Sequence, residues 1–168
     1  ALKYLKESLK MFREIGNRSG ESTTLHNLSL VYQAWDDYEV ALKYLHDALS
    51  ISREIGDRSG EGTTLNNISQ IYRVWGDYEM ALEYLHDALS ISCEIGDASG
   101  SCVALFNVAH TQLENEQQNE ATGSFVAAYR IAKQIGYAQV LQALENMTKD
   151  QGGLAYWEQL SQQMPEGE

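Results

Sequence analysis

The sequence predicts an all-α protein, a right-handed α-solenoid built from about four antiparallel helix pairs. The segment 41–80 recurs upstream as 1–40, and its first half recurs downstream as 81–100. Apolar residues within each copy return at spacings of three and four, the period of an amphipathic helix. Polar breaks interrupt the copies at the same places. Units of this kind bury their apolar faces only against neighbouring units, which is how a solenoid is stabilised.

The expected helix boundaries repeat every forty residues. Gly16-Asn17, Gly56-Asp57 and Gly96-Asp97 each combine a residue suited to the left-handed conformation with a side chain that can cap the next helix. We therefore expect a single array over residues 1–164. Its parts are the second helix of a truncated repeat (1–16), repeats at about 17–56, 57–96 and 97–136, a degenerate capping repeat (137–164) and a disordered tail (165–168).

The chain begins in phase with the second helix of a pair, because Ala1 corresponds to Ala41. This phase indicates an excerpt from a longer array whose preceding helix is missing. We expect the open end to expose the apolar face of Leu2, Leu5 and Leu9. Such an end could stack on another molecule, so self-association through the array ends is one interpretation.

Aromatic residues mark two of the repeats and are missing from the third. Trp35 and Trp75, like Tyr44 and Tyr84, are expected to be packing residues. The corresponding stretch of the third repeat, 111–120, has polar residues in place of the tyrosine, the tryptophan and the Gly-Asp-Tyr turn. We expect its two helices to pair more loosely or to be joined by a longer turn.

Charge and cysteine usage limit the possible functions. The chain has 168 residues and a net charge of −12, which opposes binding to nucleic acid. The acidic balance favours a basic partner and equally serves solubility. No apolar run is long enough to span a membrane, so we expect no membrane association. Cys93 and Cys102 belong to no paired framework and follow no secretion signal, which predicts reduced thiols and a cytoplasmic protein.

No motif predicts catalysis, a metal or a cofactor. There is no glycine-rich phosphate loop and no serine-based nucleophile elbow. The dipeptides at 46–47 and 86–87 repeat a His-Asp pair without a third ligand at metal-site spacing, so we expect both to be structural. Cys93 has no repeated base beside it that would activate a nucleophile. The sequence therefore predicts a protein that is not an enzyme.

Residues at fixed offsets in the second repeat resemble the tetratricopeptide repeat. The pattern joins paired helices through leucine, a small residue, tyrosine, Gly-Asp-Tyr and alanine, whereas the usual period is about thirty-four residues. Extra turns at the far ends of both helices account for forty. This longer form is similar to the LGN/Pins adaptors and to kinesin light chain-like bacterial arrays. The matching positions are Leu65, Ile68, Ser69, Tyr72, Gly76, Tyr78, Ala81, Leu85 and Ala88.

The resemblance implies that an extended peptide binds on a concave surface lined by the first helix of each pair. One exposed position on that helix is invariant, as Asn27, Asn67 and Asn107. A ladder of amides could pair with a peptide backbone through donor and acceptor; alternatively, these amides bond to neighbouring helices and fix repeat packing. The candidate groove residues are Thr23, His26, Asn27, Leu30, Thr63, Asn66, Asn67, Gln70, Arg73, Phe106, Asn107 and His110.

The expected function is that of a non-catalytic scaffold that holds an extended protein or peptide segment in this groove. A clamp for a C-terminal carboxylate, known in this repeat class, needs several basic residues on the groove stripe, and only Arg73 is present. Two alternatives remain open. One is a self-associating structural module that stacks through its ends, and the other is a regulatory sensor module of a larger signalling protein.

Overall fold

The computed structural model describes residues 2–164, and these residues form α-helices, one short 3-10 helix and no strand. The expected tail at 165–168 lies outside the described residues. The predicted all-helical solenoid is confirmed. Its elements are α1 (Leu2–Glu14), α2 (Arg18–Gln33), α3 (Tyr38–Ile55), α4 (Arg58–Val74), α5 (Tyr78–Glu94), α6 (Ala98–Glu114), α7 (Gln118–Ile135), α8 (Ala138–Met147), η1 (Lys149–Gln151) and α9 (Leu154–Gln163).

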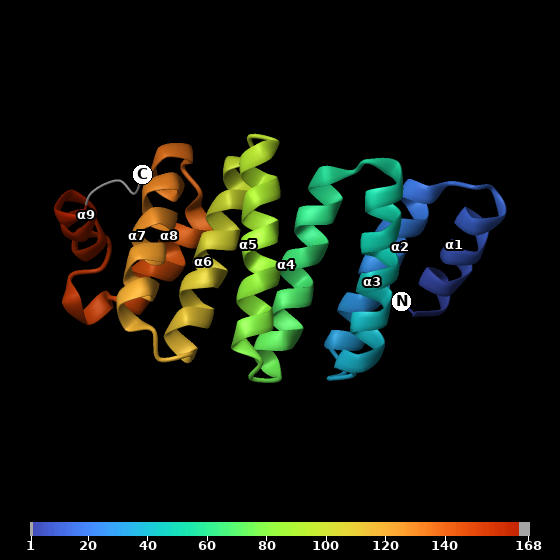
Figure 1. Ribbon diagram of the computed structural model, residues 1–168, viewed down its shortest axis with the longest axis horizontal. Coiled ribbons are helices and arrows are strands. Elements are labelled where there is room, and N and C mark those ends of the chain that lie inside the picture. The colour runs from blue at the N-terminus through green and yellow to red at the C-terminus, as the bar shows by residue number, and fades with distance from the viewer. Residues whose placement is uncertain (1, 165–168) are drawn as a thin grey trace.

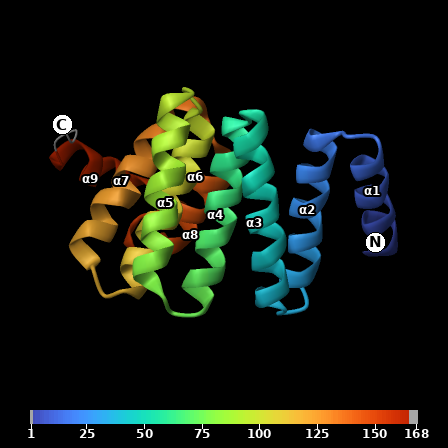
Figure 2. The same cartoon turned by 45° about the vertical axis from the view of Figure 1, so that its right-hand side comes forward.

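The helices lie side by side in chain order along the long axis of the molecule, with α1 at one end and α9 at the other (Figure 1). Short turns make successive helices antiparallel, and a view turned by 45° shows the same succession (Figure 2). The pairs are α2/α3, α4/α5 and α6/α7. Contacts also join the first helices of neighbouring pairs, α4 with α6 and α6 with α8. These first helices therefore form one layer of the array.

Each repeat boundary combines a left-handed glycine with a capping side chain. Gly56 ends α3 at φ 71°, a conformation that only glycine adopts without strain. Asp57 Oδ1 then accepts a hydrogen bond of 2.9 Å from the Gly60 amide and satisfies one of the free donors at the start of α4. Asn17 and Asp97 cap α2 and α6 with the same bond length. The repeated Gly-Asx dipeptides thus set the helix register.

Apolar side chains from both helices of each pair fill the core. In the second repeat Leu65, Ile68 and Ile71 of α4, each at most 1% exposed, pack in one cluster with Ala88 and Ile91 of α5. Burying a side chain of this size contributes about 1.5–3 kcal/mol relative to leaving it in water. Two further clusters lie on either side, one formed by α1 to α3 and one by α6 to α9, as expected for an array in which each unit packs on its neighbours.

The third pair does not show the looser packing or longer turn expected from its polar sequence. Helices α6 and α7 pack along their length as closely as α2 and α3 do, and their turn at 115–117 is no longer than the turn at 75–77. Glu116 adopts φ 61° where Gly76 has φ 76°. Helix pairing therefore imposes the turn conformation even on a residue that disfavours it.

The two tryptophans of the repeats are more exposed than expected. Trp35 is 60% exposed and Trp75 is 46% exposed. Each contacts the edge of the tyrosine three residues before it, with ring centroids 5.6 Å apart. Tyr44 and Tyr84 pack as predicted against tyrosines of the preceding helix, at 5.5 and 5.4 Å. The tryptophans lie beyond the end of the helix that carries the stripe, so helical period alone misplaces them.

The exposed apolar surface at the α1 end differs from the expected one. Leu9 is buried, while Leu2 and Leu5 are half-buried, and all three pack on the cluster between α2 and α3. The stripe predicted to be open is therefore largely covered by the following pair. The exposed apolar side chains of α1 and the turn after it are Tyr4, Met11 and Ile15.

Candidate functional site

Two hydrogen bonds between first helices place the candidate residues on one surface. Asn67 Nδ2 of α4 lies 3.1 Å from His26 Nε2 of α2. Asn107 Nδ2 of α6 donates to Asn66 Oδ1 of α4 at 2.9 Å. Because each bond links a first helix to the next one, these residues of α2, α4 and α6 lie along one surface of the first-helix layer. We call the surface formed by the twelve predicted residues the inner face.

The three invariant amides are not equivalent. Asn27 is exposed and has no hydrogen-bond partner among residues 2–164, whereas Asn67 and Asn107 are half-buried and each bonds to the preceding first helix. An amide group carries two N–H donors and an oxygen with two lone pairs. Each amide engaged between helices thus retains unused donor and acceptor capacity.

We expect these amides to differ in their effect on stability. Asn67→Ala and Asn107→Ala each remove a bond between repeats and should lower the free energy of unfolding by about 1 kcal/mol. Asn27→Ala removes no such bond and should stay within about 0.5 kcal/mol of the parent chain. Urea titration followed by circular dichroism measures all three. Equal losses at the three positions would show that the bonds to neighbouring helices contribute nothing.

The remaining polar positions of the inner face are mostly self-satisfied. Thr23 and Thr63 donate their hydroxyls to carbonyls of their own helices at 3.0 Å and remain exposed. Leu30 is 46% exposed, which leaves an apolar contact surface on α2. Gln70 is half-buried on α4. The surface therefore combines polar and apolar groups, as sites for extended ligands do.

The C-terminal ends of the first helices carry an ion pair and an unpaired amide. Arg73 of α4 pairs with Glu114 of α6 at 3.2 Å. The position equivalent to Arg73 on α2 is Gln33, whose buried Nε2 has no hydrogen-bond partner in the described part of the chain. Leaving such a donor unsatisfied costs about 1–3 kcal/mol. The sequence predicts Gln33 as an exposed position that continues the stripe of Thr23 and Leu30, whereas its Nε2 is buried.

Two predicted groove residues of α6 belong partly to the core. Phe106 and His110 contact each other edge to face with centroids 4.6 Å apart, and both contact Phe125 of α7. Each is half-buried. The third repeat thus presents two aromatic rings at positions where the second repeat has Asn66 and Gln70 and the first has His26 and Leu30.

The two histidines of the inner face have lowered pKa values. Burial lowers the pKa of His26 below 6.5. Burial also lowers that of His110, reinforced by the nearby Arg73 and opposed by Glu114. In the bond to Asn67, the neutral His26 ring can accept a hydrogen bond at Nε2, whereas both nitrogens of a protonated ring are donors. Neutral histidines are therefore part of the folded state.

Stability should consequently fall as the solution is acidified. The unfolded chain, with histidine pKa values near 6.5, binds more protons than the folded chain. Stabilisation is therefore complete above about pH 6.5 and is lost as the pH falls from there toward the lower folded values. His26→Asn introduces the residue found at Asn66 and should reduce this pH dependence. Urea titrations across the range test it, and an unchanged slope in the variant would contradict the assignment.

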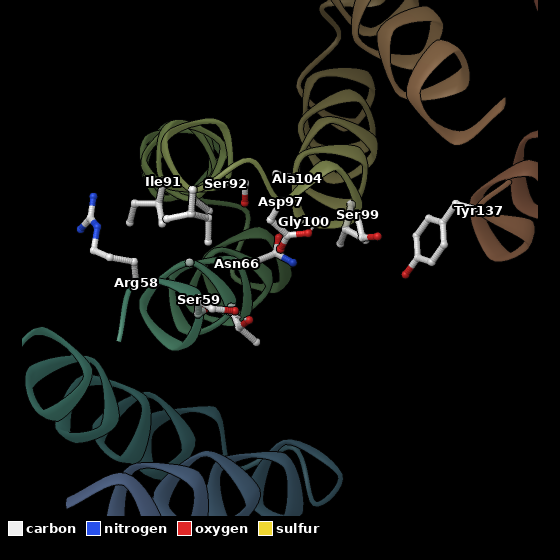
Figure 3. A pocket seen from close by; sticks show the side chains of 15 residues that line it. Arg58, Ser59, Asn66, Ile91, Ser92, Asp97, Ser99, Gly100, Ala104 and Tyr137 are labelled. Carbon is white, nitrogen blue, oxygen red and sulfur yellow. Dashed lines mark hydrogen bonds between the residues drawn. The ribbon is translucent and has the colours of Figure 1, made fainter. Parts of the chain in front are cut away.

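A cavity that sequence reasoning missed lies at the other end of the inner face. It has a volume of about 240 Å³ and is lined by the N-terminal halves of α4 and α6 and the C-terminal end of α5 (Figure 3). Gly62 is one of its lining residues, and the equivalent residues of the other repeats are Ser22 and Cys102. Ser22 Oγ bonds to a carbonyl of α3 at 3.3 Å, and Cys102 Sγ bonds to one of α7 at 3.5 Å. Aligning the copies could have revealed this substitution.

The described residues offer little for reaction chemistry. Among residues 2–164 no cluster of three or more histidine, cysteine or acidic side chains is arranged to hold a metal. Cys93 and Cys102 are free, and burial raises the pKa of Cys102 to about 11, which keeps it a thiol at neutral pH. None of the helices in residues 2–164 has the length and apolar character needed to cross a bilayer.

Comparison with known families and structures identifies the repeat. The family model described as Tetratricopeptide repeat matches residues 1–54 and 36–94, more than half of the chain. A second model, Anaphase-promoting complex subunit 5, matches residues 72–148. A search of curated protein sequences finds no match.

Solved structures share the fold at low sequence identity. The crystal structure of BtubC (BKLC) from P. vanneervenii superposes with a TM-score of 0.72 at 18% identity, and the match covers 80% of this chain and 56% of that one. Two crystal structures of a Podosopora anserina putative kinesin light chain with nearly identical TPR-like repeats give TM-scores of 0.63 and 0.61 at 13% and 14% identity. Both matches cover 96% of this chain and 92% of the other. These likenesses extend to the fold alone.

Proposed function

This chain belongs to the tetratricopeptide repeat family, and from that premise we propose that it is a non-catalytic scaffold that binds an extended segment of a partner protein along the inner face. Tetratricopeptide repeats generally mediate interactions between proteins. Stacked repeats of this kind form extended concave surfaces suited to long, thin ligands. The partner segment would run across α2, α4 and α6.

The observation that carries the proposal is unused hydrogen-bonding capacity on one continuous surface. Asn27 is exposed and unpartnered among the described residues, and Asn67 and Asn107 retain acceptor oxygens. The buried Nε2 of Gln33 lacks a partner in the same range. A peptide backbone supplies carbonyls and amides at regular intervals, and such groups can satisfy amide side chains whatever the peptide sequence.

The distribution of charge supports a basic partner. The inner face carries the compensated pair Arg73–Glu114, whereas the chain as a whole has a net charge of −12. The net negative charge attracts a cationic segment and speeds its association at low salt. Free thiols at Cys93 and Cys102 fit a reducing compartment, so we expect the scaffold to act in the cytoplasm.

Selection from a library of linear random peptides displayed on phage tests this function. The parent chain should enrich peptides that also bind as free synthetic peptides. Thr23→Arg with Thr63→Arg places two long side chains in the groove and should abolish their capture. The control, Ser50→Arg with Ser90→Arg, adds the same charge to exposed positions of α3 and α5 and should retain it. Absence of enrichment, or equal loss in both variants, would contradict groove binding.

Self-association is a second candidate because α1 exposes apolar side chains. Tyr4 is 73% exposed, Met11 61% and Ile15 70%. Large apolar groups gathered at one end of a solenoid favour contact with another molecule. Light scattering over a concentration series tests this function. A mass that rises with concentration and returns to the monomer in Tyr4→Lys supports it, and a constant monomer mass excludes it.

A further inference from the structure

We propose that the cavity at Gly62 receives one leucine-sized aliphatic side chain of the bound peptide and that a lysine or arginine of the peptide lies beside it. This inference rests on the proposed function, and it names the chemistry that the groove selects. We call the cavity the Gly62 pocket.

Gly62 is not required by the packing of the fold. A Cβ atom at this position would lie 3.4 Å from Ile91 Cγ2 and 3.8 Å from the Ala88 carbonyl oxygen, which are ordinary contacts. In the first repeat Ser22 fills the equivalent space, and its Oγ lies 3.1 Å from Ser52 Oγ. Glycine within a helix costs about 1 kcal/mol relative to alanine. The second repeat therefore carries a destabilising residue whose structural consequence is an open pocket.

The size of the Gly62 pocket fits a single side chain. Its volume is about 240 Å³. An apolar cavity of about 150 Å³ accommodates benzene, and sites for drug-sized ligands begin at about 300 Å³. The pocket thus has ample room for one aliphatic side chain and lies below the size of a site for a drug-sized ligand.

The lining of the pocket favours an aliphatic group. Methyl groups come from Ala88, Ile91 and Ile95 at the end of α5 and from Val103 and Ala104 of α6. Polar residues also line it, namely Ser59, Thr63 and Asn66 of α4, Ser92 of α5 and Ser99 of α6. A peptide running along the inner face could therefore direct one side chain downward while its backbone meets polar groups. Figure 3 shows these elements around the opening.

Charge at the pocket determines the neighbouring residue of the peptide. Arg58 is held by Glu61 and Glu94, so its charge is compensated. Asp97 accepts from the Gly100 amide through Oδ1 at 2.9 Å, and it has no cationic partner in the described part of the chain. Tyr137 extends from the start of α8 toward the same opening (Figure 3). An uncompensated carboxylate beside an aliphatic pocket is complementary to a cation next to a leucine.

Two substitutions test the proposal, and each introduces the residue that the first repeat carries at the equivalent position. Gly62→Ser introduces the residue of Ser22 and should both close the pocket and raise the melting temperature. Asp97→Asn introduces the residue of Asn17, which caps α2 with the same 2.9 Å bond, and so removes charge while retaining the cap. Cys102→Ser makes the matching change in the third repeat and serves as the control.

The probe is the capped dipeptide acetyl-Leu-Lys-amide, followed by the methyl NMR signals of the protein. We expect it to shift the methyl signals of Ile91, Ile95 and Val103. Gly62→Ser should weaken binding about tenfold or more, as should replacing the probe leucine by alanine. Asp97→Asn should weaken it about threefold at low salt and hardly at all at high salt. Cys102→Ser should bind as the parent does.

Failure of the pocket and failure of the groove give different results. If phage-selected peptides need the unblocked inner face but bind Gly62→Ser as tightly as the parent chain, the pocket inference is wrong and the proposed function stands. If the parent chain retains no peptide at all, the proposed function is wrong. Shifts of the probe confined to other methyl groups, or none at all, also overturn the pocket. The higher melting temperature of Gly62→Ser excludes unfolding as the cause of lost binding.

Discussion

Replacing Arg53 and Arg58 by the residues at the equivalent third-repeat positions, cysteine and alanine, is expected to lower the free energy of unfolding by about 3 kcal/mol. The Glu61 side chain, only 6% exposed, accepts from Arg53 Nε at 2.7 Å and from Arg58 Nη1 at 2.5 Å. Removing both guanidinium groups leaves a buried carboxylate without a counterion. The exposure of the arginines to solvent reduces the loss of free energy, whereas the burial of the carboxylate increases it.

The third repeat shows how the same boundary can be built without charge. Cys93 and Ser101 replace one arginine and its buried glutamate, and their Sγ and Oγ atoms lie 3.7 Å apart. Ala98 and Gln134 replace the other pair. The fourfold variant Arg53→Cys, Arg58→Ala, Glu61→Ser and Glu94→Gln should therefore recover most of the loss and end within about 1 kcal/mol of the parent chain.

Urea titration of the parent, twofold and fourfold variants measures this non-additivity. Adding two further substitutions to the twofold variant should raise its stability, because they remove the unpaired carboxylate. A fourfold variant no more stable than the twofold one would show that the arginines act through packing of their stems and not through Glu61. Fixed ionic strength is required, since exposed ion pairs are screened by salt.

The first repeat contains the same cluster and provides its acid response. Burial raises the pKa of Glu21, but hydrogen bonds from Arg13 and Arg18 outweigh it and hold the pKa below 4.5. A carboxyl with a depressed folded pKa stabilises the chain above its unfolded value and loses that contribution as the pH falls through the folded value. Acid destabilisation by this cluster therefore begins below about pH 4.5. It is separate from the effect of the histidines, which begins near pH 6.5.

Trp157→Ala should cost about 3–5 kcal/mol, with the loss confined to the C-terminal end of the array. Trp157 is 4% exposed. Its ring lies 5.5 Å from that of Phe125, and its Nε1 donates to the Leu144 carbonyl at 3.0 Å. This one side chain therefore connects α9 to both α7 and α8. Because each repeat contacts only its neighbours, the loss should not reach the first repeat.

Hydrogen exchange resolved by segment distinguishes local from global loss. Amides of α8 and α9 should lose protection in Trp157→Ala, whereas those of α2 and α3 should keep theirs. Trp35→Ala is the matched control, because Trp35 is 60% exposed and its removal should cost less than about 1 kcal/mol. Uniform loss of protection along the chain would show that the array unfolds as a single cooperative unit.

The sequence predicted the architecture well because local signals repeat. The Gly-Asx dipeptide recurs at each repeat boundary, so a boundary misassigned in one copy is corrected by the others. Helical period then predicts which stripe of each helix is buried. The errors lie where repetition ends. Glu116 accepts a left-handed conformation that its own preference opposes, and α1 exposes Tyr4 instead of the leucines. Both outcomes depend on packing with other helices, which propensity does not contain.

The sequence left open whether the invariant asparagines bind a peptide or bond to neighbouring helices. The structure shows such bonds for two of them, because Asn67 bonds to His26 and Asn107 bonds to Asn66. These pairs join positions 41 residues apart, one more than the repeat length, so the partners could not be read from the repeat alignment. The Gly62 pocket was missed because helical period does not register a missing side chain, and only an alignment of the copies shows the substitution.

The most direct test of groove binding is an amide NMR map of the parent chain with a synthetic peptide enriched from the phage library. The account predicts shifts at Thr23, Asn27 and Thr63 on the inner face. Ser50 and Ser90, on exposed parts of α3 and α5, should be unaffected. Shifts centred on those serines, or on Tyr4 at the open end, with an unchanged inner face would contradict it.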